Sequence, residues 1–167
     1  MKVLPVVVGI VLLAAVLVVP ASAFQAQALS ITIQQNGDAI VDFSYHLNWL
    51  EQVAVFTKIV DPAQELKSAI ERNYPGVSVT VTQVRADETS LVIHSFARTS
   101  KTLEGMTYTT PVLSFQNAQR VLDQYWFAPL IQPDFAPETA TMTFPDGYQD
   151  NFYSQITIPA LSHTLPA

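Results

Sequence analysis

The segment from Leu29 to Trp49 restricts the fold more than any other part of this sequence. Apolar residues alternate with polar ones on both sides of the pair Asn36-Gly37. A period of two residues is typical of a strand with one buried face. Asn-Gly is the strongest short hairpin signal, and it predicts a type I′ turn in which both central residues have positive φ. We therefore expect an antiparallel hairpin with one face in the core.

After Trp49 the spacing of the apolar residues becomes that of a helix. One apolar stripe runs from Trp49 to Val60. Asp61 then has the side chain of an N-cap, and Pro62 fits the first position of a helix. A second helix is predicted to begin there and to end at Pro75-Gly76. The helical region is thus expected to break or kink at Asp61.

The rest of the chain predicts further strands and one more helix. Extended segments are indicated by β-branched and alternating residues, and by turn residues such as Pro145-Asp146-Gly147. They are expected at 77–81, 91–98, 106–113, 139–144 and 152–158, with a helix over 116–126. Hairpins thus alternate with isolated helices rather than with regular βαβ units. We expect an α+β fold, in which one antiparallel or mixed sheet of about six strands has helices packed on one face.

Length and composition predict a single folded domain over residues 24–167. Hydrophobic residues make up 49% of the 167 residues and charged residues 13%, which excludes disorder on compositional grounds. The formal net charge is −6, and the Lys and Arg residues are scattered singly. We expect no nucleic-acid partner, because proteins that bind phosphates cluster their basic residues. The same charge balance argues against contact between the folded domain and an anionic membrane surface.

Residues 1–23 have the features of a cleavable secretory signal peptide. Lys2 supplies a positive charge, an uncharged apolar run extends to Val19, and Ala21-Ser22-Ala23 provides the small residues of a cleavage site. The alternative is an uncleaved anchor, because this run has the shortest length that can span a bilayer. In both cases the domain lies outside the cytoplasm, secreted or associated with a cell envelope, and only the leader could enter the membrane. The chain has no Cys, so it folds without disulfides.

Aromatic residues are concentrated in the last third of the chain, among several prolines. Trp126, Phe127, Phe135 and Tyr148 are the candidate ligand-binding residues, because exposed aromatics can bind a glycan, a peptide or a protein partner. The alternative is that these rings hold an irregular segment against the sheet, since large aromatics are mostly buried. For Trp126 we expect a core position, because it follows Leu122 by four residues on one apolar helix face.

Acidic residues in the same region are candidates for acid–base chemistry. They are Asp134, Glu138, Asp146 and Asp150, with His163 nearby in sequence. Two such carboxylates could hydrolyse a glycosidic bond if the fold brought them together. The stretch lacks the spacing of a calcium loop, and the histidines are not spaced as zinc ligands. We therefore predict no metal or cofactor, and we assign no catalytic residue.

Together these features favour an extracytoplasmic binding or structural module of a cell envelope or secreted assembly, rather than an enzyme. The alternative is a secreted hydrolase whose carboxylates converge only in the folded structure. A concave site that collects Asp134, Glu138, Asp146 or His163 would favour the hydrolase. A flat, exposed aromatic surface would favour the module.

N-terminal sequencing of the exported protein should begin at Phe24, because cleavage is expected directly after Ala23. Mass spectrometry of the intact product gives the same information. If Met1 is retained on a membrane-bound product, the leader is an anchor and the cleavage prediction is wrong.

Overall fold

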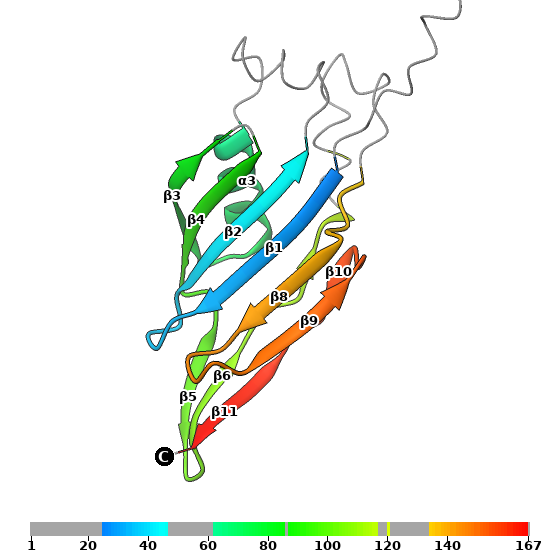
Figure 1. The fold of residues 1–167 in the computed structure, drawn as a ribbon. Coiled ribbons are helices and arrows are strands. Elements are labelled where there is room, and N and C mark those ends of the chain that lie inside the picture. Colours follow the sequence, from blue (N-terminus) through cyan, green and yellow to red (C-terminus); the bar gives the residue numbers. More distant parts are fainter. Residues whose placement is uncertain (1–24, 47–61, 86, 117–119, 121–133, 167) are drawn as a thin grey trace, which may run out of the picture.

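The computed structural model describes residues 25–46, 62–85, 87–116, 120 and 134–166 (Figure 1). Within these residues the protein is mostly β, with one short helix, α3 (Pro62–Asn73). The strands are β1 (Gln25–Ile33), β2 (Ala39–His46), β3 (Ser78–Val84), β4 (Glu88–His94), β5 (Arg98–Thr102), β6 (Gly105–Thr109), β7 (Leu113–Ser114), β8 (Thr139–Thr143), β9 (Gln149–Tyr153), β10 (Thr157–Ile158) and β11 (Ser162–Pro166).

The largest sheet has six strands in the order β3-β4-β2-β1-β8-β9. The hairpins β1–β2, β3–β4 and β8–β9 are antiparallel, and so is the pair β2–β4. The pair β1–β8 is parallel, with Leu29 opposite Ala140 and Ile31 opposite Met142. Because β1 and β8 run in the same direction, the loops that follow them lie at the same end of the sheet (Figure 1).

A second β layer consists of the three-stranded sheet β11-β6-β5 and the two-stranded sheet β10-β7. Since β6 leads into β7 and β10 leads into β11, these four strands form one long antiparallel ribbon. Thr110 joins its two halves. Its N–H donates to the carbonyl of Leu161 and its Oγ1 accepts from the N–H of Leu161, both at 2.9 Å. The buried Thr110 therefore keeps the ribbon paired where the regular strands are interrupted.

The hydrophobic core contains residues from the six-stranded sheet and from the ribbon. On β1 the alternation predicted from the sequence is confirmed, because Leu29, Ile31 and Ile33 are buried whereas Ser30 and Thr32 are only half-buried. The ribbon contributes Tyr108 and Ile158. The other buried members of this cluster are Ala39, Val41, Val79, Leu91, Ile93, Phe96, Ala97, Ala140, Met142 and Phe144.

The predicted α+β class, with helices packed on one face of a sheet, is wrong. The described residues contain one helix, which lies along the edge strand β3, and the core of the large sheet is completed by the β ribbon. The strands β5 and β11 were missed because Arg98–Thr102 and Ser162–Pro166 are short and lack apolar alternation. Their pairing with β6 comes from tertiary contacts that local sequence does not encode.

The three predicted helices have different outcomes. α3 begins at Pro62, as predicted from the preceding Asp and the proline. The expected helix over 49–60 lies outside the described residues, as does most of the one expected over 116–126. No helix in the described part of the chain has the length and hydropathy needed to cross a bilayer.

The loops of hairpins β1–β2 and β8–β9 have the same hydrogen-bond pattern. Gly37 donates its N–H to the carbonyl of Gln34, and Gly147 donates to that of Phe144, each at 2.9 Å. Both glycines have positive φ, near 87° and 88°, whereas Asn36 does not. The predicted type I′ turn is therefore wrong, and both loops are three-residue connections in which a type I turn is followed by a left-handed glycine.

Gly37 is also the point where the β1–β2 loop meets the connection between β4 and β5. Its carbonyl accepts the N–H of Ala97 at 2.8 Å. A Cβ atom at position 37 would lie 2.6 Å from the carbonyl oxygen of Ala97, so only glycine fits. In the same loop, Gln35 accepts a hydrogen bond from the hydroxyl of the buried Tyr108 at 2.9 Å, which fastens β6 to the large sheet.

Gly37→Ala should destabilise the protein by about 2 to 4 kcal/mol, because left-handed strain is added to the loss of a buried backbone contact. Gly147→Ala is the matched control, since it has the same φ and loop but no atom within 4 Å of the added Cβ. It should cost only about 1 to 2 kcal/mol. Urea denaturation of both variants measures the difference. Equal losses would mean that the contact with Ala97 contributes nothing.

Candidate ligand-binding site

Two of the four candidate aromatics lie within the described residues, at opposite ends of β8. Trp126 and Phe127 lie outside the described residues. Phe135 is half-buried just before β8, beside Asp134, whose carbonyl accepts the N–H of Ala26. Tyr148 lies beyond the other end of β8 and is 47% exposed. Of these four residues, Tyr148 is the one that the structure places at an accessible surface.

The β8–β9 loop determines the position of Tyr148. Pro145 and Gly147 suit the second and fourth positions of the type I turn that begins at Phe144, and Asp146 lies between them. The carboxylate of Asp146 accepts the N–H of Tyr148 at 3.1 Å, and the N–H of Phe144 donates to the carbonyl of Tyr148 at 2.8 Å. The backbone on both sides of the Tyr148 side chain is therefore held in place.

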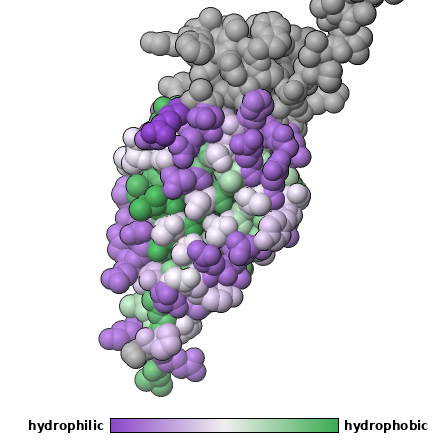
Figure 2. Space-filling view, in the orientation of Figure 1, coloured by the Kyte–Doolittle hydropathy of each residue, from purple (hydrophilic) through white to green (hydrophobic). Residues whose placement is uncertain are grey.

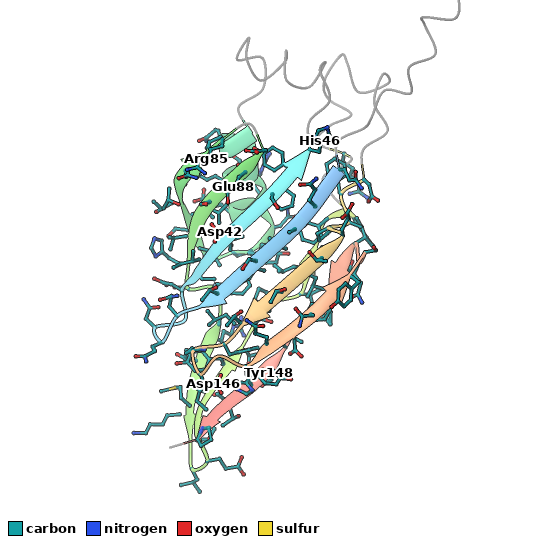
Figure 3. All side chains as sticks on the ribbon, viewed as in Figure 1. Asp42, His46, Arg85, Glu88, Asp146 and Tyr148 are labelled. Carbon is teal, nitrogen blue, oxygen red and sulfur yellow. The ribbon has the colours of Figure 1, made fainter. Side chains whose placement is uncertain are left out.

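The ring of Tyr148 stacks on the imidazole of His163, which belongs to β11. The ring centroids are 4.4 Å apart and the planes differ by 8°. The buried Phe144 ring contacts the same imidazole, with centroids 4.8 Å apart. Figure 3 shows Tyr148 and Asp146 where the β8–β9 hairpin meets the second layer. We call Tyr148, His163, Asp146 and Asp150 the Tyr148 ledge.

Hydrogen bonds to two carboxylates determine the electrostatics of the ledge. Nε2 of His163 lies 2.7 Å from Oδ2 of Asp146, and it is the donor when that carboxylate is ionised. This bond, together with the N–H of Tyr148, lowers the pKa of Asp146. The Tyr148 hydroxyl donates to Asp150 at 3.1 Å, and the adjacent negative charge raises the pKa of Tyr148.

The four candidate carboxylates fall into two groups at opposite ends of β8. Asp134 accepts the N–H of Ala136, and Glu138 accepts a hydrogen bond from the Gln25 side chain, both before β8 begins. Asp146 and Asp150 lie after it. The five residues of β8 alone span about 16 Å at the usual rise of a strand. Only Asp146 of the four pairs with His163, so the convergence that a hydrolase would need is not seen.

A second imidazole–carboxylate pair was missed by the sequence analysis. Nδ1 of His94 lies 3.0 Å from Oδ2 of Asp38, and its Nε2 lies 3.3 Å from the hydroxyl of Thr80. The other oxygen of Asp38 accepts the N–H of Ser95, whose φ is 58°. The Ser95 N–H and then His94 lower the pKa of Asp38. The hydroxyl, imidazole and carboxylate are the groups of a nucleophilic triad. Here, however, the two bonds of Asp38 hold the β1–β2 loop against β4 and its exit, and the bond between Thr80 and His94 joins β3 to β4.

A repeated pattern in the sequence marks the two loops that contribute the carboxylates of these pairs. Asn36 and Asp146 occupy the same loop position, directly before a left-handed glycine. Each accepts the N–H of the residue two positions later, at 3.0 Å from Asp38 and 3.1 Å from Tyr148. The recurrence of Asn/Asp-Gly between two alternating segments is therefore the signal that marks both loops.

Other charged groups lie on the outer face of the six-stranded sheet. Figure 3 shows His46, Arg85 and Glu88 at the end of β2 and β4 that is remote from the Tyr148 ledge, with Asp42 nearer the middle of β2. Arg85 and Glu88 form an exposed ion pair at 3.4 Å, which contributes little to stability. Asp42 accepts the Ser90 hydroxyl at 2.6 Å. In the described ranges, no three His, Asp or Glu residues gather as metal ligands would.

The Tyr148 ledge offers a rigid aromatic face beside two carboxylates. One face of the ring is covered by His163, so its exposed part includes the opposite face. Such a face attracts a cation through the ring quadrupole, and the carboxylates accept hydrogen bonds from the same group. Comparisons with models of protein families, with curated proteins and with solved structures find no match to this chain.

The free energy of unfolding should fall as the pH drops below about 4. The folded-state pKa values of Asp146 and Asp38 are lower than that of an unfolded Asp, about 3.9. Their contribution is therefore complete above that value and is lost as the pH falls through the lower folded values. Urea denaturation between about pH 2 and 6 should show a weaker pH dependence for Asp146→Asn than for the wild type.

Glu104→Gln provides the control for this experiment, because Glu104 is exposed at the tip of the β5–β6 hairpin. It should retain the wild-type dependence. Superimposable curves for Asp146→Asn and the wild type would show that the bond between His163 and Asp146 does not stabilise the fold.

Proposed function

We propose that this protein is an extracytoplasmic binding module of a cell envelope or secreted assembly, and that its Tyr148 ledge binds a Lys or Arg side chain of a partner protein. The observation that carries the proposal is that Tyr148 is exposed and yet held in one orientation by its contacts. Tyr148 is 47% exposed, yet its ring stacks on His163, its hydroxyl donates to Asp150 and its backbone N–H donates to Asp146. A preorganised exposed aromatic loses little entropy on binding, as in the anchors of protein interfaces.

The charge of the ledge supports a cationic ligand. Asp146 and Asp150 both contact Tyr148, and the whole chain has a formal net charge of −6. An acidic surface raises the association rate of basic partners, and this effect is screened by salt. A guanidinium or ammonium group over the free face of Tyr148 would lie against the ring whose hydroxyl donates to Asp150, so a negative charge is adjacent to it.

The location outside the cytoplasm is supported by residues 1–23, with their apolar run and small residues before Phe24. The distribution of acidic groups supports binding over hydrolysis. A glycosidase requires two carboxylates about 5 to 10 Å apart, one on each side of the bond that is cleaved. Asp134 and Glu138 are separated from Asp146 by the whole of β8. Asp146 and Asp150 share the ledge, but each is already held there by a hydrogen bond, from His163 and from the Tyr148 hydroxyl respectively.

Tyr148→Ala should weaken binding of a fluorescent Lys- and Arg-rich peptide by about 5- to 30-fold, the equivalent of roughly 1 to 2 kcal/mol. Fluorescence anisotropy at two salt concentrations measures this, and the wild-type affinity should fall at the higher one. Leu103→Ala is the control, because Leu103 is fully exposed on the β5–β6 hairpin, away from the ledge. Thermal unfolding checks that each variant is folded.

Two results would contradict the proposal. One is equal affinity of Tyr148→Ala and the wild type for the basic peptide. The other is selective binding of a neutral oligosaccharide in place of the peptide, which would assign the ledge to a glycan.

A further inference from the structure

The two edges of the six-stranded sheet differ in how their backbone groups are satisfied. At the β3 edge, Lys67 of α3 donates to the carbonyl of Val79 at 2.8 Å, and Glu71 accepts the N–H of Val79 at 2.9 Å. A bulge between Val81 and Gln83 also bends this strand. A covering helix and a bulge are two of the devices by which proteins prevent edge strands from pairing with other chains.

The β9 edge has neither device. At its two ends the bonds from Phe144 N–H to Tyr148 and from Ser154 N–H to Glu138 show which residues pair with β8. By alternation, the N–H and C=O groups of Gln149, Asn151 and Tyr153 point away from β8. In the described part of the chain no strand pairs with that side, and the β8–β9 register contains no bulge.

The residues at this edge are suited to pairing. Gln149, Asn151 and Tyr153 are uncharged, and the side chain of Tyr153 is 67% exposed. The strand has no proline, and its one charged residue, Asp150, accepts the hydroxyl of Tyr148. The fully exposed strand β5 provides a contrast, because Arg98 and Lys101 place positive charge along an edge of the second layer. Charged side chains of this kind oppose edge pairing.

We propose that β9 is a self-association edge, at which two copies of this chain pair antiparallel about a twofold axis through Asn151. Asn151 then lies opposite Asn151 of the other copy, and Gln149 lies opposite Tyr153. Each copy contributes three outward N–H groups and three outward C=O groups, so the pairing forms six interchain hydrogen bonds. Asp150 faces Phe152 rather than another Asp150, so no like charges meet across the axis.

The second copy is favoured over an unrelated strand because the edge is complementary to itself. A twofold interface uses the same patch on both molecules, and it closes after two copies. Pairing β9 with the basic strand β5 of another copy would instead leave each molecule with a free β9 or β5, and so would build an open chain. The proposal does not depend on what the Tyr148 ledge binds.

Single cysteines test the register, because the natural chain has none. Under mild oxidation Asn151→Cys should form a disulfide-linked dimer, since the Cα atoms of a hydrogen-bonded antiparallel pair are about 5.5 Å apart. Tyr153→Cys alone should not form this dimer, because residue 153 of one molecule is offset from residue 153 of the other by four residues, about 13 Å. An equimolar mixture of Gln149→Cys and Tyr153→Cys should form the mixed dimer.

Ser100→Cys, at the centre of the charged edge strand β5, controls for random collision. Asn151→Pro provides a test without crosslinking, because it removes an outward N–H and leaves the backbone hydrogen bonds between β9 and β8 intact. It also removes the exposed bond that the Thr141 hydroxyl donates to Oδ1 of Asn151. Light scattering should show a dimer for the wild type and a monomer for Asn151→Pro, and this monomer should still unfold cooperatively on heating. A wild-type monomer up to millimolar concentration, or equal crosslinking of Ser100→Cys and Asn151→Cys, would overturn the proposal.

Discussion

The close contact between Gly37 and Ala97 connects the two layers of this protein. The chain leaves the large sheet at the end of β4, where Ser95 has a left-handed backbone and its N–H is bound by Asp38. It then passes the β1–β2 loop so closely that a side chain at position 37 would not fit. This contact directs the chain into β5 and the ribbon, on which the burial of Leu29, Ile31 and Ile33 depends.

One loop geometry serves two purposes in this fold. In the β1–β2 hairpin the loop is packed against the exit of β4, and its Asn and Asp side chains hold backbone groups. In the β8–β9 hairpin the same geometry places Tyr148 at the surface, with His163 behind it. The difference arises from what lies next to each glycine, because Gly147 has open space around it. The candidate site is therefore found where this loop is not used for packing.

The two faces of the large sheet differ in polarity, and the proposed interaction surfaces lie on neither of them. Its inner face is apolar, whereas its outer face is covered mostly by hydrophilic side chains, with an apolar patch over β4 and β2 (Figure 2). The interaction surfaces proposed above lie instead along the β9 side of the sheet. Tyr148 directly precedes β9, so a pair of molecules joined through β9 carries one ledge at each end of the paired strands. Two ledges in one assembly would raise the avidity for a partner with repeated basic residues.

The sequence alone determined those elements that are specified by residues close together in the chain. Alternation and Asn-Gly were sufficient for the β1–β2 hairpin, the Asp and Pro before the helix marked the start of α3, and Pro-Asp-Gly marked the β8–β9 turn. The turn type, the ribbon and the parallel pair β1–β8 were decided by tertiary structure. Thr- and Ser-rich strands such as β5 acquire their conformation by pairing, and a loop glycine acquires its constraint from a residue 60 positions away. The Tyr148 ledge likewise exists only because β11 brings His163 against a distant loop, a contact that no local pattern specifies.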